Sequence, residues 1–373
     1  MSEVHEVSVE IGGTEISFET GKMAKQASGA VVVRAGDTMV LSTATAGNER
    51  EGIDFLPLTV DVEERMYAAG KIPGSFFKRE GRAGEKGTLT ARMIDRPLRP
   101  LFPKGWRRET QLVSLTLSID HVNPYDILAM NGASAALAVS DIPFPTTVGA
   151  VRIGKIEGNF VVNPAEEEIA ESDLDLVVAG TEEAILMVEA GANEVPEAEI
   201  LDALDIAHGE IKKLCAAMRE LGEKAGKPKI EITPPQPDED LIAQIQASHG
   251  EALDQATSTH DKLERQNATK AVEAAILEQY SGSPDSETYA EYRAKAQKAF
   301  DTLEKRVIRE RIAVRKQRPD GRSEKEIRPI SIEIKPLPRT HGSALFTRGQ
   351  TQALSVVALG TTREEMRLDT LGL

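Results

Sequence analysis

An internal repeat is the feature that most constrains how this chain can fold. Residues 27–47 align without gaps to residues 340–360, and six of the 21 aligned positions are identical. The identical pairs are Gly29/Gly342, Gly36/Gly349, Thr38/Thr351, Leu41/Leu354, Ser42/Ser355 and Gly47/Gly360. Two explanations are open: a duplicated domain, or two unrelated strand–turn–strand units that share glycine and threonine. A duplication would start a second copy of the first domain near Arg318.

Length and composition describe a globular protein with more than one core. The chain has 373 residues, of which 40% are hydrophobic and 28% are charged. At about 150 residues per domain, this length predicts two or three domains. The one cysteine, Cys215, cannot form an internal disulfide, and no Cys/His cluster predicts a zinc site. A single cysteine is typical of a reducing compartment.

The N-terminus and the hydropathy pattern predict neither a targeting segment nor a membrane segment. Residues 1–7 alternate apolar and polar side chains without a basic region or an apolar run, unlike a signal or transit peptide. No stretch approaches the roughly 18 apolar residues of a membrane helix. We therefore expect a cytoplasmic protein with no membrane partner.

The net charge of −15 conceals two cationic segments. Residues 65–108 carry a net charge of +9 and residues 305–328 a net charge of +6, which leaves −30 on the remainder. Such a distribution attracts a polyanion locally and repels it elsewhere. The charge pattern is therefore compatible with a nucleic-acid partner in an otherwise acidic protein.

Period-2 alternation and turn residues predict that strands dominate the first part of the chain. The expected strands are residues 4–11, 14–19, 30–33, 38–45, 55–62, 111–119, 148–153, 159–162, 174–179 and 184–189. Two helices are expected, one at residues 126–140 with Asp126 as its cap, and one at about residues 196–221. This pattern predicts an α+β domain that ends near residue 225.

A proline-rich linker separates this domain from a helical one. Residues 226–237 contain four prolines. Residues 238–315 are rich in Ala, Glu, Lys and Gln, with a break at residues 281–284, which predicts about three helices. The predicted organisation is residues 1–225, a linker at 226–237, an all-helical domain at 238–315, and a further segment at 316–373.

The common motifs of nucleotide and metal sites do not occur in the sequence. There is no Walker loop, GxGxxG, HExxH or nucleophile elbow. Residues 81–87 are glycine-rich and basic but do not open an apolar helix at the required spacing, so we expect a mobile loop rather than a nucleotide cradle. The six histidines are scattered, which argues against a histidine metal site.

One glycine-containing segment combines aromatic and cationic side chains in a protein with only 4% aromatic residues. Two adjacent rings are followed by three cations: Phe76, Phe77, Lys78, Arg79 and Arg82. Single-stranded nucleic acid needs both kinds of group, because each base has a flat face and each linkage carries a charge. The alternative is that both rings belong to the core at a strand edge, with a solvated basic flank.

Long motifs in the sequence resemble bacterial polynucleotide phosphorylase. They are IPGSFFKREGR at residues 72–82, ARMIDRPLRPLF at 91–102, RPDGR at 318–322 with IRPI at 327–330, and LPRTHGSALFTRG at 337–349. The resemblance implies two ribonuclease PH-like cores of mixed sheets with packed helices, joined by an all-helical domain and followed by KH and S1 domains. Residues 316–373 then become the truncated start of the second core. The family forms a ring-shaped homotrimer that acts on single-stranded RNA and associates with RNA-degradation complex proteins.

The resemblance also implies a reaction. In that family, inorganic phosphate attacks the 3′-terminal phosphodiester of RNA and releases a nucleoside diphosphate, with Mg²⁺ assisting. A serine run, two aspartates and a lysine of the second core supply the chemistry, at positions that would follow Leu373. We therefore expect no catalytic and no metal-binding residue in this chain, and no activity of the chain alone. A catalytically inactive RNA-binding or subunit-association product is the alternative.

The first core lacks most of the matching residues. Where the active copy has serines this copy has residues 123–126, and an aspartate at a helix start, Asp126, repels phosphate. Asp175 matches the second aspartate, but Val177 stands at the lysine position and Ile169 near the first aspartate. The first core is therefore expected to be degenerate.

The resemblance assigns to the first core the grip on RNA. Arg92, Arg96 and Arg99 surround Asp95, with which they could instead pair structurally. The full set of expected RNA-binding residues is Phe76, Phe77, Lys78, Arg79, Arg82, Arg92, Arg96 and Arg99. At the start of the second core, Arg339, His341 and Arg348 are expected at the periphery of the active site, with ordinary surface basics of a fold element as the alternative.

Overall fold

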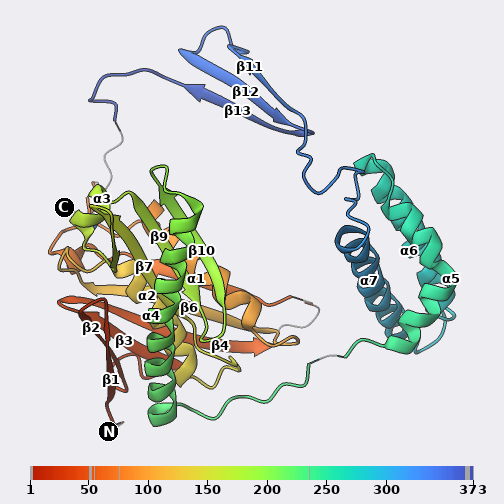
Figure 1. The fold of residues 1–373 in the computed structure, drawn as a ribbon. Helices are drawn as coiled ribbons and strands as arrows, with labels where there is room; N and C mark the ends of the chain where they lie inside the picture. The colour runs from red at the N-terminus through yellow and green to blue at the C-terminus, as the bar shows by residue number, and fades with distance from the viewer. Residues whose placement is uncertain are drawn as a thin grey trace. The chain divides into compact units, whose positions relative to one another are not determined.

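The computed structural model describes residues 3–49, 53, 55–74, 76–234, 236–365 and 370–372 (Figure 1). The chain divides into two compact units, Met1–Pro234 with Arg367–Leu373, and Pro235–Met366. Each unit is described by itself below.

The first unit contains two mixed or antiparallel sheets. The six-stranded sheet has the order β1-β2-β3-β4-β6-β5, in which only the β5–β6 pair is parallel, and the four-stranded sheet has the order β10-β9-β7-β8. The strands are β1 His5–Ile11, β2 Thr14–Thr20, β3 Gly29–Ala35, β4 Thr38–Glu49, β5 Leu58–Glu63, β6 Arg108–Ser118, β7 Gly149–Ile156, β8 Asn159–Val162, β9 Leu174–Gly180 and β10 Ile185–Ala192. Each strand expected from the alternation pattern is confirmed, with ends shifted by a few residues.

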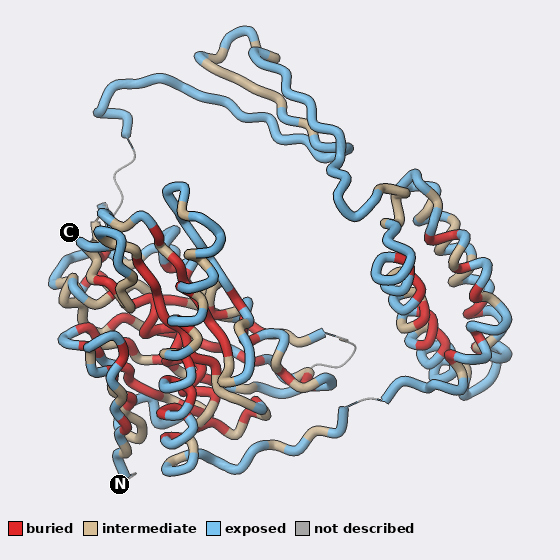
Figure 2. The backbone as a smooth tube through the Cα atoms, in the orientation of Figure 1, coloured by how far each residue is buried: buried red, intermediate tan, exposed pale blue. Residues whose placement is uncertain are grey.

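A nearly fully buried helix, α2 (Tyr125–Val139), lies at the centre of the first unit. It packs against β3 and β4 of one sheet, β7 of the other, and the long helix α4 (Glu197–Ala225). The approach to the sheet is close, because a Cβ on Gly132 would lie 2.4 Å from the Ser42 hydroxyl. The buried residues concentrate where these sheets and helices meet (Figure 2). The α+β architecture is therefore confirmed.

Two helices of the first unit were not expected. They are α1 (Glu85–Leu98) and the short α3 (Glu166–Glu171). The interpretation of residues 81–87 as a mobile loop is wrong for its second half, because Gly84 is the N-cap of α1. An apolar face that includes Ile94 and Leu98 holds α1 on the core despite Pro97 in its last turn. The expected cap of α2 is also wrong, because its N-cap is Pro124 and Asp126 is buried inside the first turn.

Asp120 ties the β3–β4 hairpin to the segment that leads into α2. Its carboxylate accepts hydrogen bonds from the Asp37 amide at 3.0 Å, the Thr38 hydroxyl at 2.8 Å, and the Val122 and Asn123 amides at 2.8 Å each. Burial alone would raise the pKa of Asp120, but the hydrogen bonds from Asn123 and Val122 outweigh it and hold the pKa below the ordinary value of 3.8. The ionised carboxylate is therefore the form that the fold requires.

Asp120→Asn is expected to destabilise the first unit by about 2 kcal/mol at pH 7. The backbone amides that donate to the Asp120 carboxylate would then donate to a neutral side-chain oxygen, which is a weaker acceptor. Since the folded pKa lies below the unfolded pKa, this contribution is present above about pH 4 and is lost as the pH falls. The difference between variant and parent should therefore shrink between pH 4 and pH 2. Denaturant unfolding followed by the fluorescence of Trp106, the only tryptophan, measures it. The control Asp37→Asn should change the free energy of unfolding little. A difference between Asp120→Asn and the parent that does not depend on pH would contradict this explanation.

The second unit contains the helices α5 (Glu239–Thr257), α6 (Lys262–Tyr280) and α7 (Tyr289–Ala313). The carboxylates of Asp238 and Asp261 cap α5 and α6 by accepting hydrogen bonds from first-turn amides. A core that includes Ile245, Leu253 and Phe300 holds the helices together. The expectation of three helices with a break at residues 281–284 is confirmed.

The same unit contains a three-stranded sheet of β11 (Ile330–Ile334), β12 (Gly342–Arg348) and β13 (Thr351–Val357). The register of its β12–β13 hairpin repeats that of β3–β4. Phe346 pairs with Ala353 as Val33 pairs with Val40, and both β-hairpins turn through a glycine of positive φ, Gly349 and Gly36. Equal register at equal aligned positions favours duplication over two unrelated units. All residues of β11–β13 are exposed or half-buried (Figure 2).

The segment after α4 runs along the end of α2. The Lys229 ammonium donates to the carbonyls of Leu137 at 2.7 Å, Ala138 at 3.1 Å and Ser140 at 2.7 Å. The Ile230 amide donates to the Asp141 carbonyl at 2.9 Å. These bonds satisfy carbonyls that a helix C-terminus leaves without partners. We call residues 226–232 the strap; within the predicted linker, it belongs structurally to the first unit.

Candidate nucleic-acid interface

The two adjacent phenylalanines lie outside the core of the first unit. Phe76 is 92% exposed and Phe77 is 75% exposed, and their rings meet edge to face with centroids 5.5 Å apart. The core-packing alternative is therefore wrong. Upstream, the Met66 amide donates to the Glu80 carboxylate at 3.0 Å, so the two ends of this loop are tied together. The rings project from an anchored loop into solvent.

Three cations follow these rings on the same loop. Lys78, Arg79 and Arg82 are exposed, and their side chains have no hydrogen bond or ion pair with any described residue. Lys78 has a positive φ of 50°, a conformation that reverses the chain directly after Phe77. We call Phe76, Phe77, Lys78, Arg79 and Arg82 the aromatic–cationic loop. It offers stacking surfaces beside charges that are free to bind phosphate, and its RNA binding stays a prediction.

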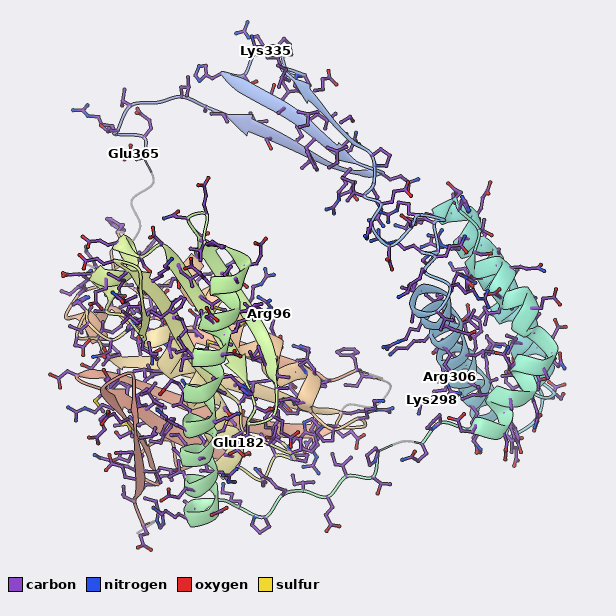
Figure 3. All side chains as sticks on the ribbon, viewed as in Figure 1. Arg96, Glu182, Lys298, Arg306, Lys335 and Glu365 are labelled. Carbon is purple, nitrogen blue, oxygen red and sulfur yellow. The ribbon has the colours of Figure 1, made fainter. Side chains whose placement is uncertain are left out.

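The three arginines of the next motif differ in their partners. Arg99 binds the Asp95 carboxylate through Nε at 2.7 Å and also donates to the Leu58 carbonyl at 3.0 Å, a structural role. Arg96 forms an ion pair with Glu189 on β10. Figure 3 labels Arg96 in the first unit. Arg92 is exposed and has no partner among the described residues. Arg92 therefore remains the freest of the three to bind RNA.

Beside α1 lies a cavity of about 930 Å³. Residues of α1, α2, β7, β9 and β10 line it, among them Arg92, Asp126, Arg152, Asp175 and Val177. Three of these are positions compared above with the active copy: Asp126 in place of the serine run, Asp175 as the match to the second aspartate, and Val177 at the lysine position. The structure brings these three positions into one pocket, and the degeneracy of this site stays a prediction.

A buried arginine joins the two carboxylates of this pocket. Arg152 binds Asp126 in bidentate fashion, with Nη1–Oδ1 at 3.1 Å and Nη2–Oδ2 at 3.0 Å, and donates from Nε to Asp175 at 2.7 Å. Burial alone would raise the pKa of Asp126, but the charge of Arg152 outweighs it and holds the pKa below its usual range. The negative charge of Asp126 is therefore compensated within the protein by the positive charge of Arg152.

The pocket does not fit a magnesium ion. Among the described residues, no group of three or more His, Cys, Asp or Glu side chains is placed to hold a metal. Both carboxylate oxygens of Asp126 accept hydrogen bonds from Arg152, and so does one carboxylate oxygen of Asp175. A divalent cation needs several oxygen ligands at once, so no step of a reaction can be routed through a metal here.

Family models match most of the chain. The models are the 3′ exoribonuclease family domain 1 at residues 13–143, domain 2 of that family at residues 146–210, and the polyribonucleotide nucleotidyltransferase RNA binding domain at residues 240–323. Polyribonucleotide nucleotidyltransferases from Roseiflexus castenholzii and Herpetosiphon aurantiacus are each 50% identical, over 99% and 100% of this chain. The matches cover 50% and 48% of those relatives, so the chain spans about half their length.

The chain belongs to the polyribonucleotide nucleotidyltransferase family. Among solved structures, rice (Oryza sativa) Rrp46 is similar at 16% identity and a TM-score of 0.46, covering 55% of this chain and 94% of that one. Within the part of the chain that the structure describes, no helix is long and apolar enough to cross a membrane.

The predicted periphery residues are not brought together. Arg339 precedes β12 and is exposed, and the His341 Nδ1 accepts a hydrogen bond from the Leu359 amide at 2.8 Å. Arg348 lies at the other end of β12, about 20 Å away along a seven-residue strand. The placement of these residues at an active site stays a prediction.

Sequence reasoning missed Arg152, the residue that organises the pocket beside α1. It lies inside β7, whose neighbouring positions are buried and apolar. An arginine between apolar residues of a predicted strand was the available signal, because an arginine is almost never fully buried unless it is paired. Its partners could not be named, because they lie 26 and 23 residues away in sequence.

Proposed function

We propose that this chain is the RNA-gripping part of an enzyme that degrades RNA by phosphorolysis from the 3′ end and releases nucleoside diphosphates. The observation that carries the proposal is the exposed aromatic–cationic loop, in a chain of the polyribonucleotide nucleotidyltransferase family. Exposing two phenyl rings to water is unfavourable unless they have a partner, and bases stack on such rings. Phosphates would then bind Lys78, Arg79 and Arg82.

In this proposal the first unit holds RNA and performs no bond cleavage. Phosphorolysis needs a bound phosphate and cations that stabilise the developing charge. Support comes from Arg152, whose guanidinium is occupied by Asp126 and Asp175, so it is not free to bind phosphate. Val177 offers no charge at the pocket wall.

The remaining properties that we propose follow the family. Inorganic phosphate is the co-substrate, and Mg²⁺ belongs to a second ribonuclease PH-like core, to which the repeated register of β12 and β13 assigns these strands. A homotrimer in the cytoplasm, acting on messenger RNA with RNA-degradation complex proteins, completes the proposal. The proposed reaction breaks the terminal P–O bond of RNA and forms a P–O bond to phosphate.

This chain, given polyadenylate, inorganic phosphate and Mg²⁺, is expected to release no ADP, because its pocket offers neither a metal site nor a free anion site. The measurement is phosphate-dependent ADP release, with the Roseiflexus castenholzii protein as the positive control for the assay. Release by this chain that disappears in the Asp175→Asn variant would place catalysis in the first unit and overturn the division of labour.

A second candidate function is a non-catalytic RNA-binding or subunit-association protein. The exposed sheet β11–β13 favours it, because apolar side chains such as Ile332 and Leu354 lie open to a partner. Mixing this chain with the full-length Roseiflexus castenholzii protein and following its ADP release separates the two. ADP release from polyadenylate that changes when this chain is added in an amount too small to sequester the RNA would favour association as the function.

A further inference from the structure

Three exposed cations on helix α7 have no neutralising partner. The side chains of Lys298, Lys305 and Arg309 form no hydrogen bond and no ion pair within residues 236–365, which the structure describes without a gap. Other cations of the same helix are paired: Lys295 with Glu291 at 2.7 Å and Arg306 with Glu239 at 2.7 Å. Figure 3 labels Lys298 and Arg306 on this domain. We call Lys298, Lys305 and Arg309 the cationic stripe.

The stripe runs along the face of α7 opposite to the core. Spacings of seven and four residues place its members on one side of a helix, whereas Phe300, Leu303 and Val307 are buried on the other. At about 1.5 Å of rise per residue, the stripe is about 16 Å long. The acidic groups near this face are engaged, Glu291 by Lys295 and Asp301 by the Gln297 amide at 3.0 Å.

We propose that the cationic stripe binds the phosphate backbone of single-stranded RNA, as a contact surface additional to the aromatic–cationic loop. The proposal rests on the proposed function, because it assumes that RNA is the polyanion. Charge complementarity and length fit several consecutive phosphates of a strand. The family model that matches residues 240–323 is described as an RNA binding domain, without specifying residues.

The stripe contacts phosphates rather than bases. The exposed ring nearest to it in sequence, Tyr292, is covered by the Lys295 ammonium at 5.6 Å from its centroid. Binding at the stripe is therefore independent of RNA sequence and strongly dependent on salt, whereas binding at Phe76 and Phe77 includes stacking that salt does not screen.

The test compares two double variants of the 373-residue chain that remove equal charge from the same helix. Lys305→Gln/Arg309→Gln alters the stripe, and Lys295→Gln/Arg306→Gln alters paired cations. The probe is fluorescein-labelled oligoadenylate, titrated by anisotropy at several KCl concentrations. The stripe variant should lower the slope of log K against log salt by about 1.4, because single strands lose about 0.7 per phosphate contact. The control should keep the parent slope, and circular dichroism should show equal helicity.

Each of the following results would overturn the inference. Equal losses in both double variants would mean that net charge alone acts, and an unchanged slope in the stripe variant would mean that RNA does not contact it. If the stripe variant loses affinity for polyglutamate but not for oligoadenylate, the surface serves an acidic protein instead. A Phe76→Ala/Phe77→Ala variant measured in parallel separates the two proposals. If only this variant loses affinity for oligoadenylate, the cationic stripe does not bind RNA. If neither this variant nor the stripe variant loses affinity, the proposed function is refuted as well.

Discussion

Arg152→Met is expected to lower the free energy of unfolding of the first unit by about 3–5 kcal/mol, the cost of leaving a buried charge without its partner. Asp126 is 3% exposed and would lose both hydrogen bonds to the guanidinium. Trp106 fluorescence during denaturant unfolding measures the loss, because this buried tryptophan belongs to the same unit. The effect should exceed that of any single exposed ion pair in the protein.

Two further variants make this expectation specific. Arg96→Met breaks the half-exposed pair with Glu189 and should cost less than about 1 kcal/mol. Asp126→Asn/Arg152→Met removes both charges and should regain part of the lost stability, because no uncompensated ion remains in the core. A cost of Arg152→Met no larger than that of Arg96→Met would mean that Asp126 is hydrated and that its pair with Arg152 stabilises the fold no more than an exposed pair does.

Phe76→Ala/Phe77→Ala should weaken the binding of single-stranded RNA by about 100-fold, since stacking contributes about 1–3 kcal/mol per base. Both rings are exposed, so the substitutions remove no core packing and the fold should persist. Anisotropy titration of labelled oligoadenylate gives the affinity. Leu201→Ala/Ile206→Ala, which trims exposed apolar side chains of α4, is the matched control and should bind as the parent does.

Charge in the same loop should act differently from the rings. Arg79→Ala is expected to reduce the slope of log K against log salt by about 0.7, the value for one phosphate contact, whereas the phenylalanine variants should leave that slope unchanged. Unchanged affinity for RNA in both the phenylalanine variant and Arg79→Ala would mean that RNA does not bind to this loop. The two readouts therefore separate stacking from charge.

Local patterns predicted most of the strands because alternation of side chains needs no long-range information. The hairpin of β1 and β2 follows from Gly12 and Gly13, which both have positive φ in the structure. Helix α1 was missed because glycines precede it and Pro97 lies in its last turn, although its apolar face packs on the core. Tertiary packing outweighed these local signals.

The candidate site was predicted unevenly. The composition of the aromatic–cationic loop was visible in the sequence, but the exposure of Phe76 and Phe77 is decided by the tertiary fold and could not be deduced from composition. The triad of Arg152 with Asp126 and Asp175 joins three elements, α2, β7 and β9, and pairings across that distance cannot be deduced from one sequence. The duplication, open on identities alone, is favoured by the equal register of the β3–β4 and β12–β13 hairpins.

The strap sets where the first unit can be separated from the rest of the chain. Its Lys229 holds three carbonyls at the end of α2, and Ile230 and Ile232 pack against the core. A polypeptide that stops with α4 at Ala225 would therefore expose the end of its central helix to water. A polypeptide that comprises the first unit, for crystallography or spectroscopy, should therefore extend beyond Ile232, the last residue of the strap that packs against its core.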